Sequence, residues 1–101
     1  MTTNVGLLVT LEAKPGREAE VAKFLEDGKA LVEQEPQTLV WFGIRLSETS
    51  FGIFDAFASD DGRQAHLSGE VAKALGQITP ELLAGPPDIR PVDVLADKIS
   101  P

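Results

Sequence analysis

The side chains best suited to proton transfer in this sequence are its only histidine, His66, and the carboxylate Asp55 that precedes it. An imidazole with an ordinary pKa of about 6.5 is mostly neutral at pH 7 and can act as a general base. A nearby carboxylate can orient such a ring or take part in ligand binding. We therefore interpret His66 as a candidate base assisted by Asp55, against the alternative that both are structural.

Further side chains are candidates for substrate binding. The guanidinium of Arg45 stays charged and can donate several hydrogen bonds to an anionic intermediate, although it could instead pair with an acidic residue. Planar aromatic side chains can line a pocket for a planar ligand, and the candidates are Trp41, Phe54 and Phe57. Because aromatic residues in strands usually belong to the core, we expect only one or two of them to contact a ligand.

The stretch from Phe51 to His66 is expected to position this chemistry. In a strand over residues 51–57, alternation places Asp55 on the same face as Phe51, Ile53 and Phe57. Ser59 is a good N-cap residue, so a helix is predicted to follow it directly. His66 would then lie about two turns along that helix, close to the end of the strand.

Hydrophobic periodicity predicts the remaining elements. Strands are expected over 5–13, 38–46 and 90–96, with helical segments over 17–33, 60–69 and 71–78 and a polar tail over 97–101. Gly69 is expected to interrupt the second helical region. Thr79 followed by Pro80 is typical of a helix start, so a separate short helix is predicted from there to Gly85.

This order of elements predicts an α+β ferredoxin-like fold, with a split βαββαβ pattern. Right-handed crossovers place the helices on one face of a four-stranded antiparallel sheet. The strand over 38–46 carries apolar side chains on both faces, and Phe54 adds to the face away from the helices. Soluble monomers rarely leave so large an apolar surface bare. We therefore predict a homodimer in which the two sheets face each other.

Composition narrows the function classes. A chain of 101 residues that is 43% hydrophobic is expected to form one domain over 1–101. The net charge of −7 argues against a nucleic-acid partner or an anionic membrane surface. One histidine without cysteine falls short of a metal site with three or four ligands. Without a secretion signal or an apolar run of about 18 residues, the expected location is cytoplasmic.

Several local features occur together in one protein family. They are the turn Lys14-Pro15-Gly16, the strand end Phe54-Asp55-x-Phe57, the cap Ser59 and the helix residue His66. In these features the sequence resembles the antibiotic biosynthesis monooxygenases, which are dimeric α/β barrels. The resemblance implies a cofactor-independent oxygenase that acts on a small aromatic molecule such as a quinol or an anthrone.

A second interpretation remains open from the sequence. Members of this family often carry another histidine shortly after the first, where this chain has Gly69-Glu70-Val71. The alternative is therefore a non-catalytic dimeric module that binds a small apolar ligand or regulates an enzyme, or an isomerase of the same fold.

Overall fold

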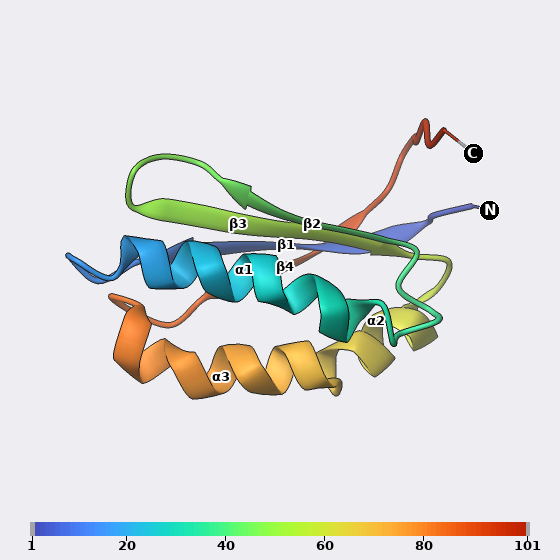
Figure 1. The fold of residues 1–101 in the computed structure, drawn as a ribbon. Coiled ribbons are helices and arrows are strands. Elements are labelled where there is room, and N and C mark those ends of the chain that lie inside the picture. Colours follow the sequence, from blue (N-terminus) through green and yellow to red (C-terminus); the bar gives the residue numbers. More distant parts are fainter. Residues whose placement is uncertain (1, 101) are drawn as a thin grey trace.

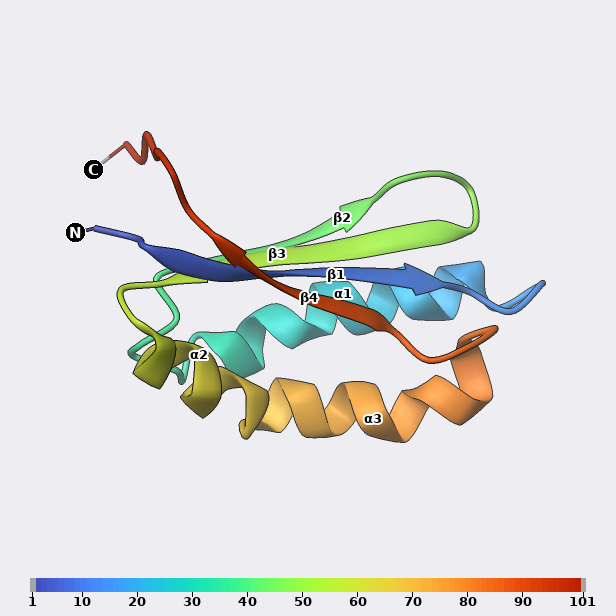
Figure 2. The ribbon, with the colours of Figure 1, turned by 180° about the vertical axis from the view of Figure 1, so that it is seen from behind.

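The computed structural model describes residues 2–100, which form a sheet covered on one side by helices (Figure 1). The strands are β1 (Val5–Glu12), β2 (Val40–Arg45), β3 (Ser50–Phe57) and β4 (Asp88–Asp93). They form an antiparallel sheet in the order β2-β3-β1-β4. The helices are α1 (Glu18–Val32), α2 (Asp60–Leu67) and α3 (Glu70–Leu82). Figures 1 and 2 show all of them on the same face of the sheet, which confirms the predicted α+β ferredoxin-like fold.

Strand register brings the apolar side chains of the central strands to the helix layer. β1 and β3 pair along their whole lengths, with Val9 opposite Ile53 and Leu11 opposite Phe51. These residues form the core with Val21 and Leu25 of α1 and Leu75 and Leu82 of α3. Asp55 of β3 lies on this same face, opposite Leu7 on one side and Trp41 on the other.

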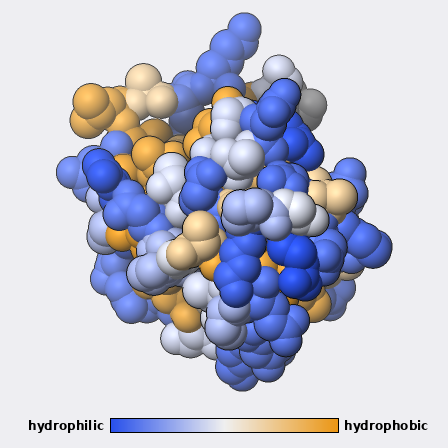
Figure 3. All heavy atoms as spheres, turned by 90° about the vertical axis from the view of Figure 1, so that its left-hand side faces the viewer, coloured by the Kyte–Doolittle hydropathy of each residue, from blue (hydrophilic) through white to orange (hydrophobic). Residues whose placement is uncertain are grey.

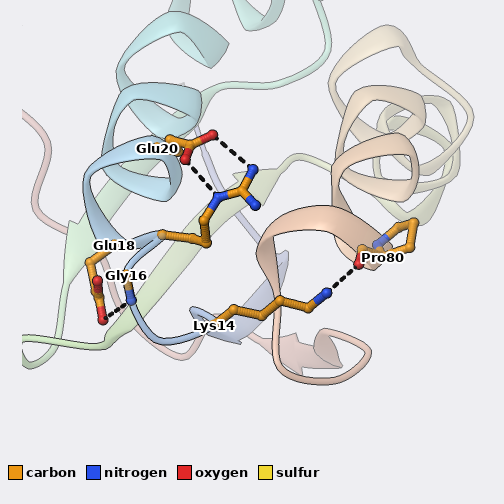
Figure 4. Close-up of polar contacts among 6 residues, drawn as sticks. Lys14, Gly16, Glu18, Glu20 and Pro80 are labelled. Carbon is orange, nitrogen blue, oxygen red and sulfur yellow. Dashed lines mark hydrogen bonds and ion pairs between the residues drawn. The ribbon is translucent and has the colours of Figure 1, made fainter.

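The start of α1 and the end of α3 meet at one edge of the molecule (Figure 4). The turn before α1 uses Gly16 at φ 85°, a left-handed conformation that suits glycine. Its backbone N–H donates to Glu18 at 3.3 Å, which helps to begin the helix. Lys14 donates from Nζ to the carbonyl of Pro80 at 2.7 Å, so this turn is tied directly to the last turn of α3.

The separate helix predicted from Thr79 to Gly85 is wrong, because α3 is one helix that continues through Pro80 to Leu82. The hydroxyl of Thr79 donates back to the carbonyl of Leu75 at 2.7 Å, so it does not cap a new helix. Proline lacks one backbone donor, but in the last turn that loss removes only one helical hydrogen bond. The predicted interruption at Gly69 is confirmed, since this residue separates α2 from α3.

The last strand lies earlier in the chain than predicted, over Asp88–Asp93 instead of 90–96. β4 is an edge strand that pairs only with β1, and this position tolerates Pro91 in the strand. Residues 94–100 have no regular secondary structure. The backbone N–H and the hydroxyl of Thr3 both donate to Asp97, which holds part of the predicted polar tail beside the first strand.

The sheet face away from the helices remains apolar and partly exposed. The exposed fractions are 39% for Leu8, 57% for Phe42 and 40% for Ile44, with Phe54 between Leu8 and Phe42 in the sheet. In Figure 3, hydrophobic atoms gather at the upper left, toward the sheet layer, while the helix layer below is mostly hydrophilic. Among residues 2–100, no helix is long and apolar enough to cross a bilayer.

Candidate functional site

Local packing brings His66 against the sheet. Ser59 has an extended conformation and its carbonyl accepts the first hydrogen bonds of α2, from the N–H groups of Gly62 and Arg63. A Cβ on Gly62 would lie only 3.2 Å from the backbone oxygen of Gln37 and 3.3 Å from Cβ of Phe57. The absence of a side chain there lets α2 lie close to the sheet. His66 follows one turn later and is 7% exposed.

The imidazole of His66 lies between two carboxylates. Its Nδ1 is 2.6 Å from Oε1 of Glu35, and its Nε2 is 2.9 Å from Oδ2 of Asp55. The Glu35 oxygen also accepts a hydrogen bond of 2.8 Å from the hydroxyl of Thr38. The ring of Phe57 lies 5.5 Å from the imidazole, centroid to centroid, and covers one side of it. Two segments, the turn after α1 and strand β3, therefore hold the ring that α2 presents.

Asp55 is fully buried but does not use its hydrogen-bonding capacity within the chain. The 2.9 Å contact with His66 has the length of an ion pair without the alignment of a strong hydrogen bond. Neither carboxylate oxygen has an aligned donor among residues 2–100. A buried carboxylate with unsatisfied oxygens is costly. Such a group is expected where a ligand or a proton completes the site.

The two carboxylates shift the protonation equilibrium of His66. Burial lowers the pKa of the ring, because the charged form is less well solvated inside the protein. The contacts and negative charges of Asp55 and Glu35 raise it by more, so the pKa of His66 lies above its ordinary value of about 6.5. The protonated ring is therefore favoured more strongly here than in a free histidine.

Asp55 and His66 both line a pocket of about 280 Å³ between the sheet and the helices α2 and α3. Most of the wall is aliphatic or aromatic, and it includes Trp41, whose indole Nε1 is buried without a partner in the described chain. Gly76 of α3 also lines the pocket, and a Cβ built on it would have no atom within 4 Å. This arrangement suits a small, largely apolar ligand that offers one or two polar atoms.

The structure brings together some of the predicted site residues but not all of them. Trp41 lines the pocket with His66 and Asp55, and Phe57 packs beside His66. Phe54 lies on the opposite face of the sheet, where it lines a separate hollow with Phe42 and the tail. Arg45 lies 4.6 Å over the ring of Phe51 and donates to the carbonyl of Glu48 at 3.2 Å. Of the predicted substrate-binding residues, Phe57, Phe54 and Arg45 do not line the pocket that holds His66.

Sequence reasoning missed Glu35. In the sequence, Glu35-Pro36 reads only as the end of the preceding helix. The structure places this turn against α2, so that Glu35 and His66 also line an outer hollow of about 160 Å³. No local pattern predicts this contact, because it depends on how α1 and α2 pack. Within residues 2–100, no three His, Cys, Asp or Glu side chains are grouped so that they could hold a metal ion.

Known structures share this fold. A proposed antibiotic biosynthesis monooxygenase from Caulobacter crescentus is 29% identical, with a TM-score of 0.79 over 93% of this chain and 92% of its own. Another, from Nitrosomonas europaea, is 12% identical with a TM-score of 0.81 over 94% of both chains, and shows the fold alone. This chain shares the fold of these proposed antibiotic biosynthesis monooxygenases, which confirms at the level of the fold the resemblance seen in the sequence.

The same comparison finds a nearer relative. NE2512, a protein of unknown function from Nitrosomonas europaea, is 45% identical and has a TM-score of 0.96. The match covers 98% of this chain and 96% of that one, so the two proteins share one family. No protein-family model and no curated protein matches the sequence.

Proposed function

We propose that this protein is a small monooxygenase that needs no bound cofactor and acts on an electron-rich aromatic molecule such as an anthrone or a quinol. The observation that carries this proposal is the contact between Asp55 and His66 on the wall of an apolar pocket. Proton-accepting groups in such a pocket are what the activation of a weakly acidic aromatic compound requires. Trp41 adds a flat surface and an unused N–H donor.

The reaction balances with dioxygen as the oxidant. The Asp55–His66 pair takes a proton from the substrate, and the resulting anion gives an electron directly to dioxygen. For an anthrone, recombination at the ring carbon forms a peroxide, and the stored proton returns to its outer oxygen. The remaining C–H bond and the O–O bond then break, and the second proton leaves with the departing hydroxide as water. One CH₂ group and one O₂ thereby become one carbonyl group and one water. The pocket walls exclude bulk water and hold the substrate plane.

Oxygen uptake by the purified protein tests this proposal with a panel of anthrones and quinols. General-base assistance is worth roughly 10²- to 10⁴-fold, so Asp55→Asn and His66→Ala should each lose activity on that scale. Asp61→Asn is the matched control, because it changes an exposed carboxylate of the same helix. Equal rates for wild type and His66→Ala would remove His66 from the mechanism.

A binding function is the second candidate, and the position of Arg45 favours it. This cation lies outside the pocket, so the pocket wall has no permanently charged group to stabilise an anionic intermediate. A protein that only binds would show saturable fluorescence quenching of Trp41, the only tryptophan, by panel compounds. Binding without any oxygen uptake would support this candidate, or an isomerase that uses the same proton transfer without dioxygen.

We propose a homodimer formed through the open sheet face. Its support is the exposed apolar surface of Leu8, Phe42 and Ile44, which a second sheet would cover. Sedimentation equilibrium at micromolar concentration should find a dimer, and Phe42→Glu should shift it to single chains. Leu31→Glu is the control, because Leu31 is also partly exposed but lies on α1 in the helix layer. A wild-type protein that sediments as single chains would refute the dimer. The cytoplasmic location expected from the sequence stays a prediction.

A further inference from the structure

The contacts of His66 indicate which of its two protonation states, neutral or doubly protonated, is favoured in the site. Both ring nitrogens face a carboxylate oxygen, at 2.6 Å for Glu35 and 2.9 Å for Asp55. An ionised carboxylate only accepts hydrogen bonds, so each nitrogen needs its own proton to face one favourably. A neutral ring would leave an unprotonated nitrogen next to one of the two oxygens. The geometry therefore favours the doubly protonated imidazolium.

Charge balance at the site points the same way. The side chain of Asp55 is 1% exposed and that of Glu35 is 17% exposed, so neither charge is well solvated. Ionised carboxylates that are poorly solvated are stabilised by a nearby positive charge. The charged groups that face the ring are Asp55 from β3 and Glu35 from the turn after α1, while Phe57 covers its side. Arg45 is too distant to supply that charge, because it lies over Phe51.

We propose that Glu35 and Asp55 hold His66 as the imidazolium, so that Asp55 is the proton acceptor and His66 supplies the positive charge that an anionic intermediate needs. Glu35 is then a positioning residue, which acts on the reaction only through the ring. This inference rests on the proposed oxygenase function and assigns its roles. It replaces the neutral histidine base that the sequence suggests, and it gives the protonated ring the role that the sequence suggests for Arg45.

Each group has a defined task in this arrangement. An Asp55 oxygen, which has no aligned donor among residues 2–100, accepts the substrate proton as the substrate O–H or C–H bond breaks. The imidazolium keeps both of its protons and stabilises the oxyanion or the peroxide electrostatically. Asp55 later returns its proton to the leaving oxygen. The raised pKa of His66 supports this assignment, because the ring then remains charged at higher pH than an ordinary histidine.

Nitrogen NMR of the His66 ring tests the inference without any substrate. With ¹⁵N-labelled histidine, only the Nδ1 and Nε2 signals of His66 are expected from ring nitrogens, since the chain has one histidine. In the wild type, both ring nitrogens should carry protons at pH 7. Removing one opposite charge at this distance should lower the titration midpoint by about 1 unit or more in Glu35→Gln. Glu33→Gln, which changes an exposed carboxylate paired with Lys29, should leave the midpoint unchanged.

The outcomes separate this inference from the proposed function. A ring that is neutral at pH 7, or a midpoint that is the same in Glu35→Gln and wild type, would overturn the imidazolium whatever the activity. A charged, Glu35-dependent ring in a protein without oxygen uptake would instead contradict the oxygenase alone. If uptake is found, Glu35→Gln should lower kcat and narrow the pH range of activity on its alkaline side. If Glu35 is only structural, Glu35→Gln would lower the stability of the protein without changing the titration midpoint of the His66 ring.

Discussion

Replacing Gly28 by alanine should stabilise the protein. Gly28 lies in the buried stripe of α1, where glycine costs about 1 kcal/mol of helix stability relative to alanine. The new methyl group would lie 3.4 Å from Cη2 of Trp41 and 3.5 Å from Cγ2 of Val71, which are ordinary van der Waals distances. No backbone atom is in the way. The free energy of unfolding should therefore rise by about 1 kcal/mol.

Urea denaturation at fixed protein concentration measures this change. For a domain of this size, about 1 kcal/mol corresponds to a rise in Tm of roughly 4–8 °C. The slope of the free energy with urea should stay the same, because the exposed surface hardly changes. Gly6→Ala is the opposite control, since its Cβ would lie 2.5 Å from the backbone oxygen of Asp55. A midpoint for Gly28→Ala below that of wild type would refute this account of how α1 packs on Trp41.

Three further changes have defined outcomes. The pKa of His66 is raised on folding. Its contribution to stability is therefore complete below the unfolded-state pKa of about 6.5 and is lost as pH rises through the folded-state pKa. Between pH 5.5 and 9, the urea midpoint should fall more in wild type than in His66→Gln. Phe57→Ala removes a fully buried ring and should cost about 3–5 kcal/mol by the same assay. Gly16→Ala places a side chain at φ 85° in open space and should cost about 1–2 kcal/mol, whereas Gly85→Ala, also in open space but without a positive φ, should change the midpoint little.

Most of the fold could be predicted because local patterns and global packing agree. The alternation over β3 places Asp55 toward the helices, and α2 begins directly after Ser59 as predicted, although the Ser59 hydroxyl makes no cap hydrogen bond. The approach of His66 to Asp55 therefore follows from the sequence. Helix ends were less predictable. Thr79-Pro80 has the local chemistry of a helix start, yet packing of Leu82 in the core keeps the chain helical beyond it.

The rest of the site depends on contacts that local sequence does not encode. Arg45 pairs with Phe51 in the sheet, whereas Asp55 pairs with Trp41, and this register separates the cation from the pocket. Phe54 follows a simpler rule, because consecutive residues of a strand point to opposite faces and Phe54 directly precedes Asp55. Glu35 reaches His66 only through the packing of α1 against the rest of the helix layer, which no spacing in the sequence reveals.

Gly76 is an exposed position on the wall of the pocket, where substitutions can change the room available to a ligand. Alanine, valine and leucine at this exposed position would add side chains of increasing size at the pocket wall without a clash at Cβ, and each is a better helix former than glycine. Asp55 and His66 lie on other elements, β3 and α2, and would keep their places. This series of variants would rank candidate compounds by size. The largest compound that each variant accepts would indicate the size of the natural ligand.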